Sequence, residues 1–142
     1  MASKRGSIVE TLDPARNFTL TTEDRVRAVA AGPPAYIRRR RAIEDLEEGI
    51  VRVLVEQCEE ARSAGAGRAE LAAHAHSNVP WRALERLNEL ISRHNLYYPI
   101  EANLPVHPRT GELMERSGEP WRPMKPRRVE ELVEQALVRA CG

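Results

Sequence analysis

The stretch between the double proline at 33–34 and the small-residue spacer at 63–67 constrains the fold more than any other part of the chain. Its apolar residues recur with the period of an α-helix, and a helix from Pro34 to about Arg62 would be roughly 40 Å long. The apolar stripe is broader than a surface helix needs, because Val51 and Val55 widen it. We therefore expect a long helix contacted on more than one side, as the central helix of the fold or as a dimer seam. The stripe consists of Ile43, Leu46, Ile50, Val53, Leu54, Cys58 and Ala61.

Helical patterns also occupy much of the remaining chain. Thr21 and Asp24 have the spacing of a helix N-terminal cap, and Gly32 followed by two prolines is typical of a helix end. The chain is thus predicted to be mainly α, with four to five helices around the long central helix. The expected helices cover residues 21–31, 34–62, 68–76, 80–92 and 126–140.

Residues 95–125 break the helical pattern. They contain five prolines, and Tyr97-Tyr98 and Val106 favour extended chain. The run from Pro108 to Gly111 is typical of a tight turn. We expect a proline-rich irregular segment or a small β-hairpin near 96–117.

Length and composition indicate one globular domain. The chain has 142 residues, of which 42% are hydrophobic and 30% charged, so we expect an N-terminal arm at 1–20 and a single helical domain at 21–142. No apolar run is long enough to cross a membrane, and two cysteines 83 positions apart form no disulfide framework. These features predict a cytoplasmic protein without membrane association.

Charge is balanced overall, at +1, but it is divided into blocks. Residues 1–43 carry nine basic and four acidic side chains, whereas residues 44–62 carry two basic and seven acidic ones. The arginines at 38–41 stand near an expected helix start, where the helix dipole disfavours positive charge. An acidic partner would stabilise them, and so would the neighbouring Glu44 and Asp45. Candidate partner-binding residues are Arg38, Arg39, Arg40 and Arg41.

Three prolines, at 120, 123 and 126, recur with the three-residue period of polyproline II. This spacing favours a stiff strap across the domain with Trp121 buried, and it also allows docking into an aromatic groove of a partner. The strap adds three candidate partner-binding residues, Trp121, Arg122 and Lys125.

No local motif points to catalysis, to a metal or to a cofactor. His74 and His76 would point apart on a helix, so they are not expected to share a metal ion. A small enzyme with a pocket in the loop at 95–105 is a remote alternative. Its candidate residues are Tyr97, Tyr98, Glu101 and Asn103, with His94 or His107.

One arrangement resembles winged helix-turn-helix proteins over about 50 residues: a short helix from Arg68, a four-residue connection at 77–80, a longer helix, and a turn at 108–111. The resemblance implies that Pro80–Ser92 is a recognition helix. The connection lacks the usual glycine, and two glutamates on the same face would oppose DNA. The implied DNA-binding residues are Arg82, Arg86 and Arg109.

The sequence therefore favours a non-enzymatic helical interaction or regulatory protein, which binds a protein partner or forms a homodimer. Winged-helix DNA binding is the alternative. Nucleic acid is the less favoured partner, because the net charge is close to zero.

Overall fold

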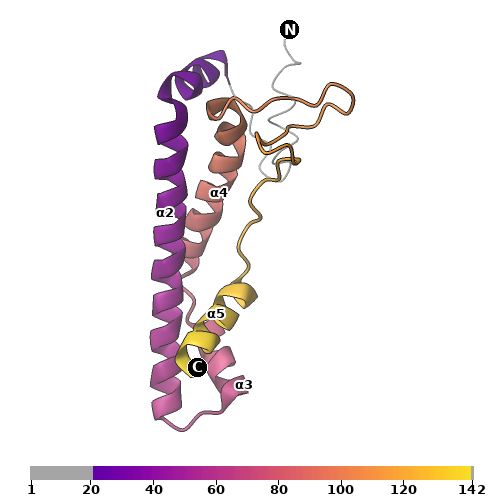
Figure 1. Ribbon diagram of the computed structural model, residues 1–142. Helices are drawn as coiled ribbons and strands as arrows, with labels where there is room; N and C mark the ends of the chain where they lie inside the picture. Colours follow the sequence, from indigo (N-terminus) through magenta and orange to yellow (C-terminus); the bar gives the residue numbers. More distant parts are fainter. Residues whose placement is uncertain (1–20, 142) are drawn as a thin grey trace. The chain divides into compact units, whose positions relative to one another are not determined.

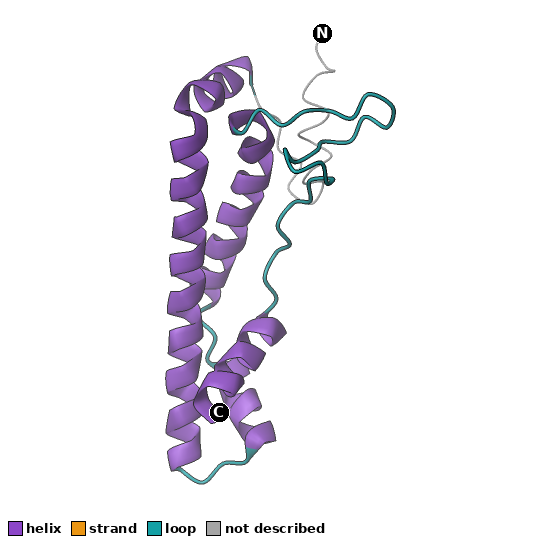
Figure 2. Cartoon of the chain, in the orientation of Figure 1, coloured by secondary structure: helices purple, strands orange, loops and turns teal. Residues whose placement is uncertain are grey.

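The computed structural model describes residues 21–141, apart from the side chains of Val29 and residues 31–34. The predicted arm at 1–20 lies outside the described residues. The described part is mainly helical and contains no strand, which confirms the mainly α class (Figure 1, Figure 2). Its four helices are α2 (Thr22–Ser63), α3 (Arg68–Ser77), α4 (Trp81–Glu101) and α5 (Val129–Cys141).

α2 is one continuous helix where the sequence predicted two. It begins as expected, because the Thr21 hydroxyl accepts a hydrogen bond from the backbone N–H of Asp24 (3.0 Å). The expected stop at 32–34 is wrong: the φ of about −65° that proline imposes is itself helical, so the helix continues, although each ring removes an N–H donor and crowds the carbonyl four residues earlier. The first turns of α2 bend away from the rest in Figure 1, as is typical of a proline kink.

This continuity changes the interpretation of the arginine block. Residues 38–41 lie several turns inside α2 and not near its start. The helix dipole acts mainly within the first and last turns, so it does not disfavour these arginines. The argument for an acidic partner from the helix dipole is therefore wrong, and any such role must rest on exposure and pairing.

Backbone contacts divide the chain into two compact units. Unit 1 comprises the described residues up to Arg41 together with Leu90–Lys125. Unit 2 comprises Ala42–Glu89 and the described residues from Pro126 onward. The single domain predicted at 21–142 stays a prediction.

The predicted apolar stripe of the long helix forms part of the core of unit 2. Ile50, Leu54 and Cys58 are at most 2% exposed. One edge of the stripe is more exposed than predicted, because Val53 is 37% exposed and Leu46 is only half-buried, whereas Val51, which was expected to widen the stripe, is fully buried. Val53 follows Ile50 by three residues and so lies about 60° further round the helix. The other buried apolar residues of unit 2 are Ile43, Val51, Leu71, Ala75, Val79, Leu84, Leu87, Val129, Leu132, Val133, Ala136, Leu137 and Ala140.

α4 is longer than predicted. It continues past Ser92 to Glu101, so Tyr97 and Tyr98 are helical and not extended. Pro99 lies inside its last turn. Because a proline there removes a single donor, the helix tolerates it.

A backbone cap ends α4. Asn103 adopts a left-handed conformation, with φ of 53°. The N–H of Leu104 donates to the carbonyl of Pro99 (3.0 Å), and the N–H of Asn103 donates to the carbonyl of Ile100 (3.1 Å). These two bonds form a Schellman motif, in which asparagine takes the place usually held by glycine.

The loop after α4 contains the predicted tight turn. The N–H of Gly111 donates to the carbonyl of His107 (2.9 Å), and Gly111 has φ of 75°, which favours glycine. Only isolated bridges flank this turn among the described residues, so the hairpin predicted near 96–117 is not confirmed. The bridges join Val106 to Leu113 and Met114 to Pro120.

Two asparagines of α4 hold the proline strap by its backbone. In unit 1 the amide of Asn95 donates to the carbonyl of Met124 (2.9 Å) and accepts from its N–H (2.8 Å). In unit 2 Asn88 makes the same pair of bonds with Arg127 (3.1 and 2.7 Å). We call these pairs the asparagine clamps.

Asn88 and Asn95 are seven residues apart on α4, and the residues that they bind, Arg127 and Met124, are three apart in the chain. The clamped residues each follow a proline, Pro123 or Pro126, which has no N–H of its own. The non-proline residue therefore supplies both the donor and the acceptor.

We predict that Asn95→Ala lowers the free energy of unfolding by about 1–3 kcal/mol, because it leaves the backbone N–H and carbonyl of Met124 without partners. Urea denaturation would measure this. Arg93→Ala, an exposed position on the same helix, is the control and should change stability by less than about 0.5 kcal/mol. Equal effects of the two substitutions would contradict a clamping role.

Candidate functional site

A buried ion pair lies at the centre of unit 1. Arg39 of α2 pairs with Glu101 in the last turn of α4, and their side chains are only 18% and 3% exposed. The guanidinium also lies over the ring of Tyr97, 5.4 Å from its centroid. Tyr97 and Glu101 are four residues apart and thus share one face of the helix. Two groups of α4 therefore hold one arginine of α2 in place.

The same groups line a cavity of about 200 Å³, which we call the Arg39 cavity. Asp24 and Arg27 also line it, and the Arg27 guanidinium lies 3.5 Å from the Asp24 carboxylate. Arg27 is 70% exposed, so this second pair is open to solvent. The cavity is lined by Asp24, Arg27, Ala28, Ala35, Arg39, Tyr97 and Glu101.

An aromatic cluster also lies in unit 1. Tyr98 meets Tyr36 edge-on, with ring centroids 4.8 Å apart, and stacks on Trp121 at 6.0 Å. His94 lies 5.3 Å from the Tyr98 ring. Burial is the main cause that raises the pKa of the Tyr98 hydroxyl. The cluster is thus built around one tyrosine that stays protonated.

His94 is the most unusual titratable group of the cluster. Its side chain is only 3% exposed, and its Nδ1 atom has no hydrogen-bond partner among the described residues. Burial, followed by the positive charges of Arg39 and Arg40, lowers its pKa from 6.5 to about 4. His94 is therefore neutral near pH 7.

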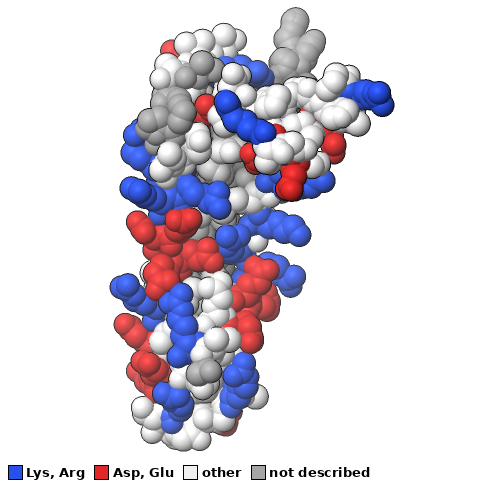
Figure 3. Space-filling view, in the orientation of Figure 1, with Lys and Arg blue, Asp and Glu red and all other residues white. Residues whose placement is uncertain are grey.

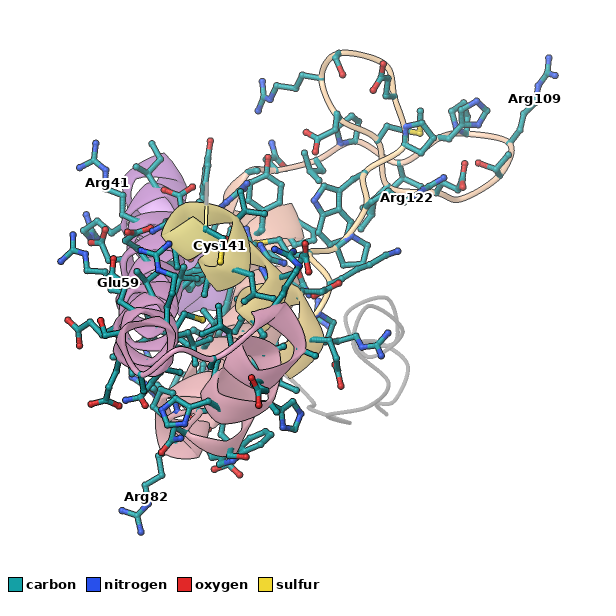
Figure 4. The ribbon with its side chains drawn as sticks, turned by 90° about the horizontal axis from the view of Figure 1, so that it is seen from below. Arg41, Glu59, Arg82, Arg109, Arg122 and Cys141 are labelled. Atoms are coloured by element: carbon teal, nitrogen blue, oxygen red, sulfur yellow. The ribbon has the colours of Figure 1, made fainter. Side chains whose placement is uncertain are left out.

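The four consecutive arginines do not form one patch. Successive helical residues turn by about 100°, so Arg39 points inward to Glu101 while its neighbours are exposed. Arg40 has an interaction partner, and its charge reaches His94. Figure 4 shows Arg41 pointing away from α2.

The candidate residues of the strap lie at the end of unit 1. Trp121 is 8% exposed and packs on Tyr98, as the strap hypothesis expects. Arg122 is exposed, and its guanidinium donates to the backbone carbonyl of Trp121 (3.3 Å). Lys125 is exposed and has an interaction partner.

The residues implied by the winged-helix resemblance are all exposed. In unit 2, Arg82 points into solvent (Figure 4), whereas Arg86 lies 3.5 Å from the Glu89 carboxylate. In unit 1, Arg109 stands at the tip of the turn (Figure 4). Glu85, also exposed, adds a second carboxylate to the helix of Arg82.

Sequence reasoning found part of the Arg39 cavity. Tyr97 and Glu101 were candidates for a pocket, but as loop residues of a remote enzyme hypothesis. Asp24 and Arg27 were missed, because nothing in the sequence links them to residues more than 70 positions away. The asparagine clamps were missed too, although their seven-residue spacing beside a Pro-x-x-Pro repeat was a usable signal.

Residues 21–141 contain neither a cluster of metal-ligating side chains nor a helix that could span a membrane. No group of three or more His, Cys, Asp or Glu side chains lies close enough together there to hold a metal ion. None of the helices in that part is both long and apolar enough to cross a bilayer.

We predict that His94 makes stability depend on pH. Its folded pKa is lowered, so its contribution is complete above about pH 6.5 and is lost as pH falls toward 4. The shift corresponds to about 3 kcal/mol at low pH. Urea denaturation between pH 7.5 and 4 would measure the loss, and the ring proton shifts of His94 would report its pKa by NMR.

His94→Phe is the control, because it keeps an aromatic ring and has no proton to gain. Subtracting its pH profile from that of the wild type should leave a curve that falls between pH 6.5 and 4. Parallel profiles for the two proteins would rule out His94 as the source.

Comparison with known proteins finds no match for this chain among family models, curated proteins or solved structures.

Proposed function

We propose that the chain is a non-enzymatic interaction protein that binds an acidic segment of a protein partner on an exposed face of α2. This face consists of Ile37, Arg38 and Arg41 in unit 1, and we call it the Arg38 face. The observation that supports it is the pair of exposed arginines. Neither Arg38 nor Arg41 forms an ion pair with a carboxylate in the part of the chain that the structure describes.

The spacing of these residues makes one surface. Arg41 is three residues from Arg38 and four from Ile37, so it is the helical neighbour of both, whereas Ile37 and Arg38 lie about 100° apart on either side of it. Ile37 is 46% exposed, which leaves an apolar side chain beside two positive charges. Arginine and large apolar residues are enriched at the centres of protein interfaces. A partner segment with carboxylates around an apolar side chain fits this chemistry.

A second copy of the chain also offers such an acidic surface. In unit 2 a shallow cleft is lined by four glutamates, of which Glu47 is paired with Arg127 and Glu134 with Arg68. Figure 3 shows acidic side chains in several groups that alternate with basic ones. Self-association and binding of a different protein are thus two outcomes of one test. The cleft is lined by Glu47, Arg127, Glu130, Glu131, Glu134 and Gln135.

The proposal also covers the role of α2, the segment at 96–117 and the cellular location of the protein. We infer that α2 is the central helix, because it supplies core residues to unit 2 and Arg39 to unit 1. Of the segment at 96–117, only the part after α4, residues 102–117, is then irregular and proline-containing. A cytoplasmic location is consistent with the free thiols of Cys58 and Cys141.

DNA binding through Arg82 and Arg86 stays the alternative. No contact in unit 2 favours it, because Arg86 is already paired with Glu89 and the face is interrupted by carboxylates. Arg82 and Arg86 provide a charge-matched control for the binding experiment below.

The test compares wild type with Arg38→Glu/Arg41→Glu and with Arg82→Glu/Arg86→Glu. Sedimentation equilibrium would measure self-association, and an array of synthetic peptides rich in glutamate and leucine would provide an acidic partner. We predict that the first double variant weakens the interaction at least tenfold, because two attractive charges become repulsive. Raising the salt concentration should weaken wild-type binding as well.

The control should bind as the wild type does. A wild type that stays monomeric and retains no acidic peptide would overturn the proposal, and so would undiminished binding by Arg38→Glu/Arg41→Glu. A gel shift on DNA that Arg82→Glu/Arg86→Glu abolishes would establish the alternative instead.

A further inference from the structure

We propose that the Arg39 cavity is a binding site for a small monocarboxylic acid. The carboxylate would meet the Arg39 guanidinium, and a short hydrocarbon stem would lie against the apolar wall. The cavity is separate from the Arg38 face, because Arg39 and Arg38 point to different sides of α2. The two proposals can therefore fail independently.

The first argument is the state of the arginine. A guanidinium has five N–H donors in a fixed plane, and the contact with Glu101 is made through one terminal nitrogen. The Nε atom has no hydrogen-bond acceptor among the described residues, but it is closed off from solvent, so a ligand would meet the terminal nitrogens instead. The carboxylate of Glu101 and the ring of Tyr97 already fix the orientation of the group. Arg39 is thus a positioned donor with capacity for a further acceptor, and carboxylates suit its geometry.

The second argument is charge. The four ionised side chains of the lining, two arginines and two carboxylates, sum to zero. A phosphate monoester would bring nearly two negative charges into this neutral and partly buried site, whereas a monocarboxylate brings one. Arg27 stands at the exposed side of the lining and can face that single charge, since it is 70% exposed.

The third argument is size and polarity. Sites for drug-sized ligands usually measure about 300–1,000 Å³, and the Arg39 cavity measures about 200 Å³. The remaining walls are the methyl groups of Ala28 and Ala35 and the ring of Tyr97. These walls accept a hydrocarbon stem and offer it no polar partner except the tyrosine hydroxyl.

Binding of a carboxylate would also explain why the Arg39 cavity contains an ion pair that is shielded from solvent. Burial of a charged pair costs desolvation free energy that its mutual attraction barely offsets. Apolar residues of similar volume would stabilise the fold at least as well. A guanidinium held ready for a ligand gives the pair a function besides stability.

The test is an NMR titration of the full chain that follows the methyl signals of Ala28 and Ala35. The probes are acetate, propionate and butyrate, with inorganic phosphate as the arm that distinguishes a general anion site. We expect saturable shifts of both methyls, tighter binding of propionate or butyrate than of acetate, and weak or no binding of phosphate. The methyls of Ala75 and Ala136, buried in unit 2, should not move.

Two substitutions test the assignment of the carboxylate to Arg39. Arg39→Lys keeps the charge opposite Glu101 but loses the planar fork, and it should weaken propionate binding at least tenfold. Arg38→Lys, at the exposed neighbour, is the matched control and should not alter binding. Should Arg39→Lys fail to fold, Arg27→Gln at the solvent side of the cavity should still weaken binding severalfold.

The proposal is overturned if none of the acids shifts the Ala28 and Ala35 methyls more than the unit 2 methyls. It is also overturned if phosphate binds as tightly as propionate, or if a folded Arg39→Lys variant binds propionate as the wild type does.

Discussion

The ion pair between Arg39 and Glu101 is the contact on which unit 1 depends. Its carboxylate is 3% exposed, so removing either partner would leave a buried charge without compensation, at a cost of about 3–5 kcal/mol. Glu101 reaches this position only because α4 continues through Pro99. The backbone cap at Asn103 then ends the helix directly after the carboxylate. A helix that ended at Ser92 would supply neither Glu101 nor Tyr97.

The asparagine clamps supply hydrogen-bond partners to the backbone of the strap. An extended strap has no backbone partners of its own, and each buried N–H or carbonyl without a partner costs free energy. A side-chain amide carries a donor and an acceptor side by side, so a single asparagine satisfies both backbone atoms of one strap residue. Asn95 does this for Met124 in unit 1 and Asn88 for Arg127 in unit 2.

The sequence predicts the features that depend on neighbouring residues. Helical periodicity identified α3, α5 and most of α2, and the spacing of Thr21 and Asp24 located the start of α2. The errors arose where one residue can act in two ways. Proline was treated as a helix stop, although its φ is helical and a single missing donor can be tolerated. The cavity could not be foreseen, because its residues come from two helices far apart in the chain.

The four arginines at 38–41 show that consecutive charged residues do not by themselves form one surface. Helical geometry sends four consecutive side chains in four directions, so one arginine is buried while Arg38 and Arg41 remain in solvent. The buried member is paired with Glu101, one of the residues that the sequence suggested for a pocket. His94, the nearby imidazole, is held neutral with a pKa of about 4 and is shielded from solvent. We therefore base the proposed function on the positioned guanidinium and on the exposed Arg38 face, because both offer donors to acidic groups.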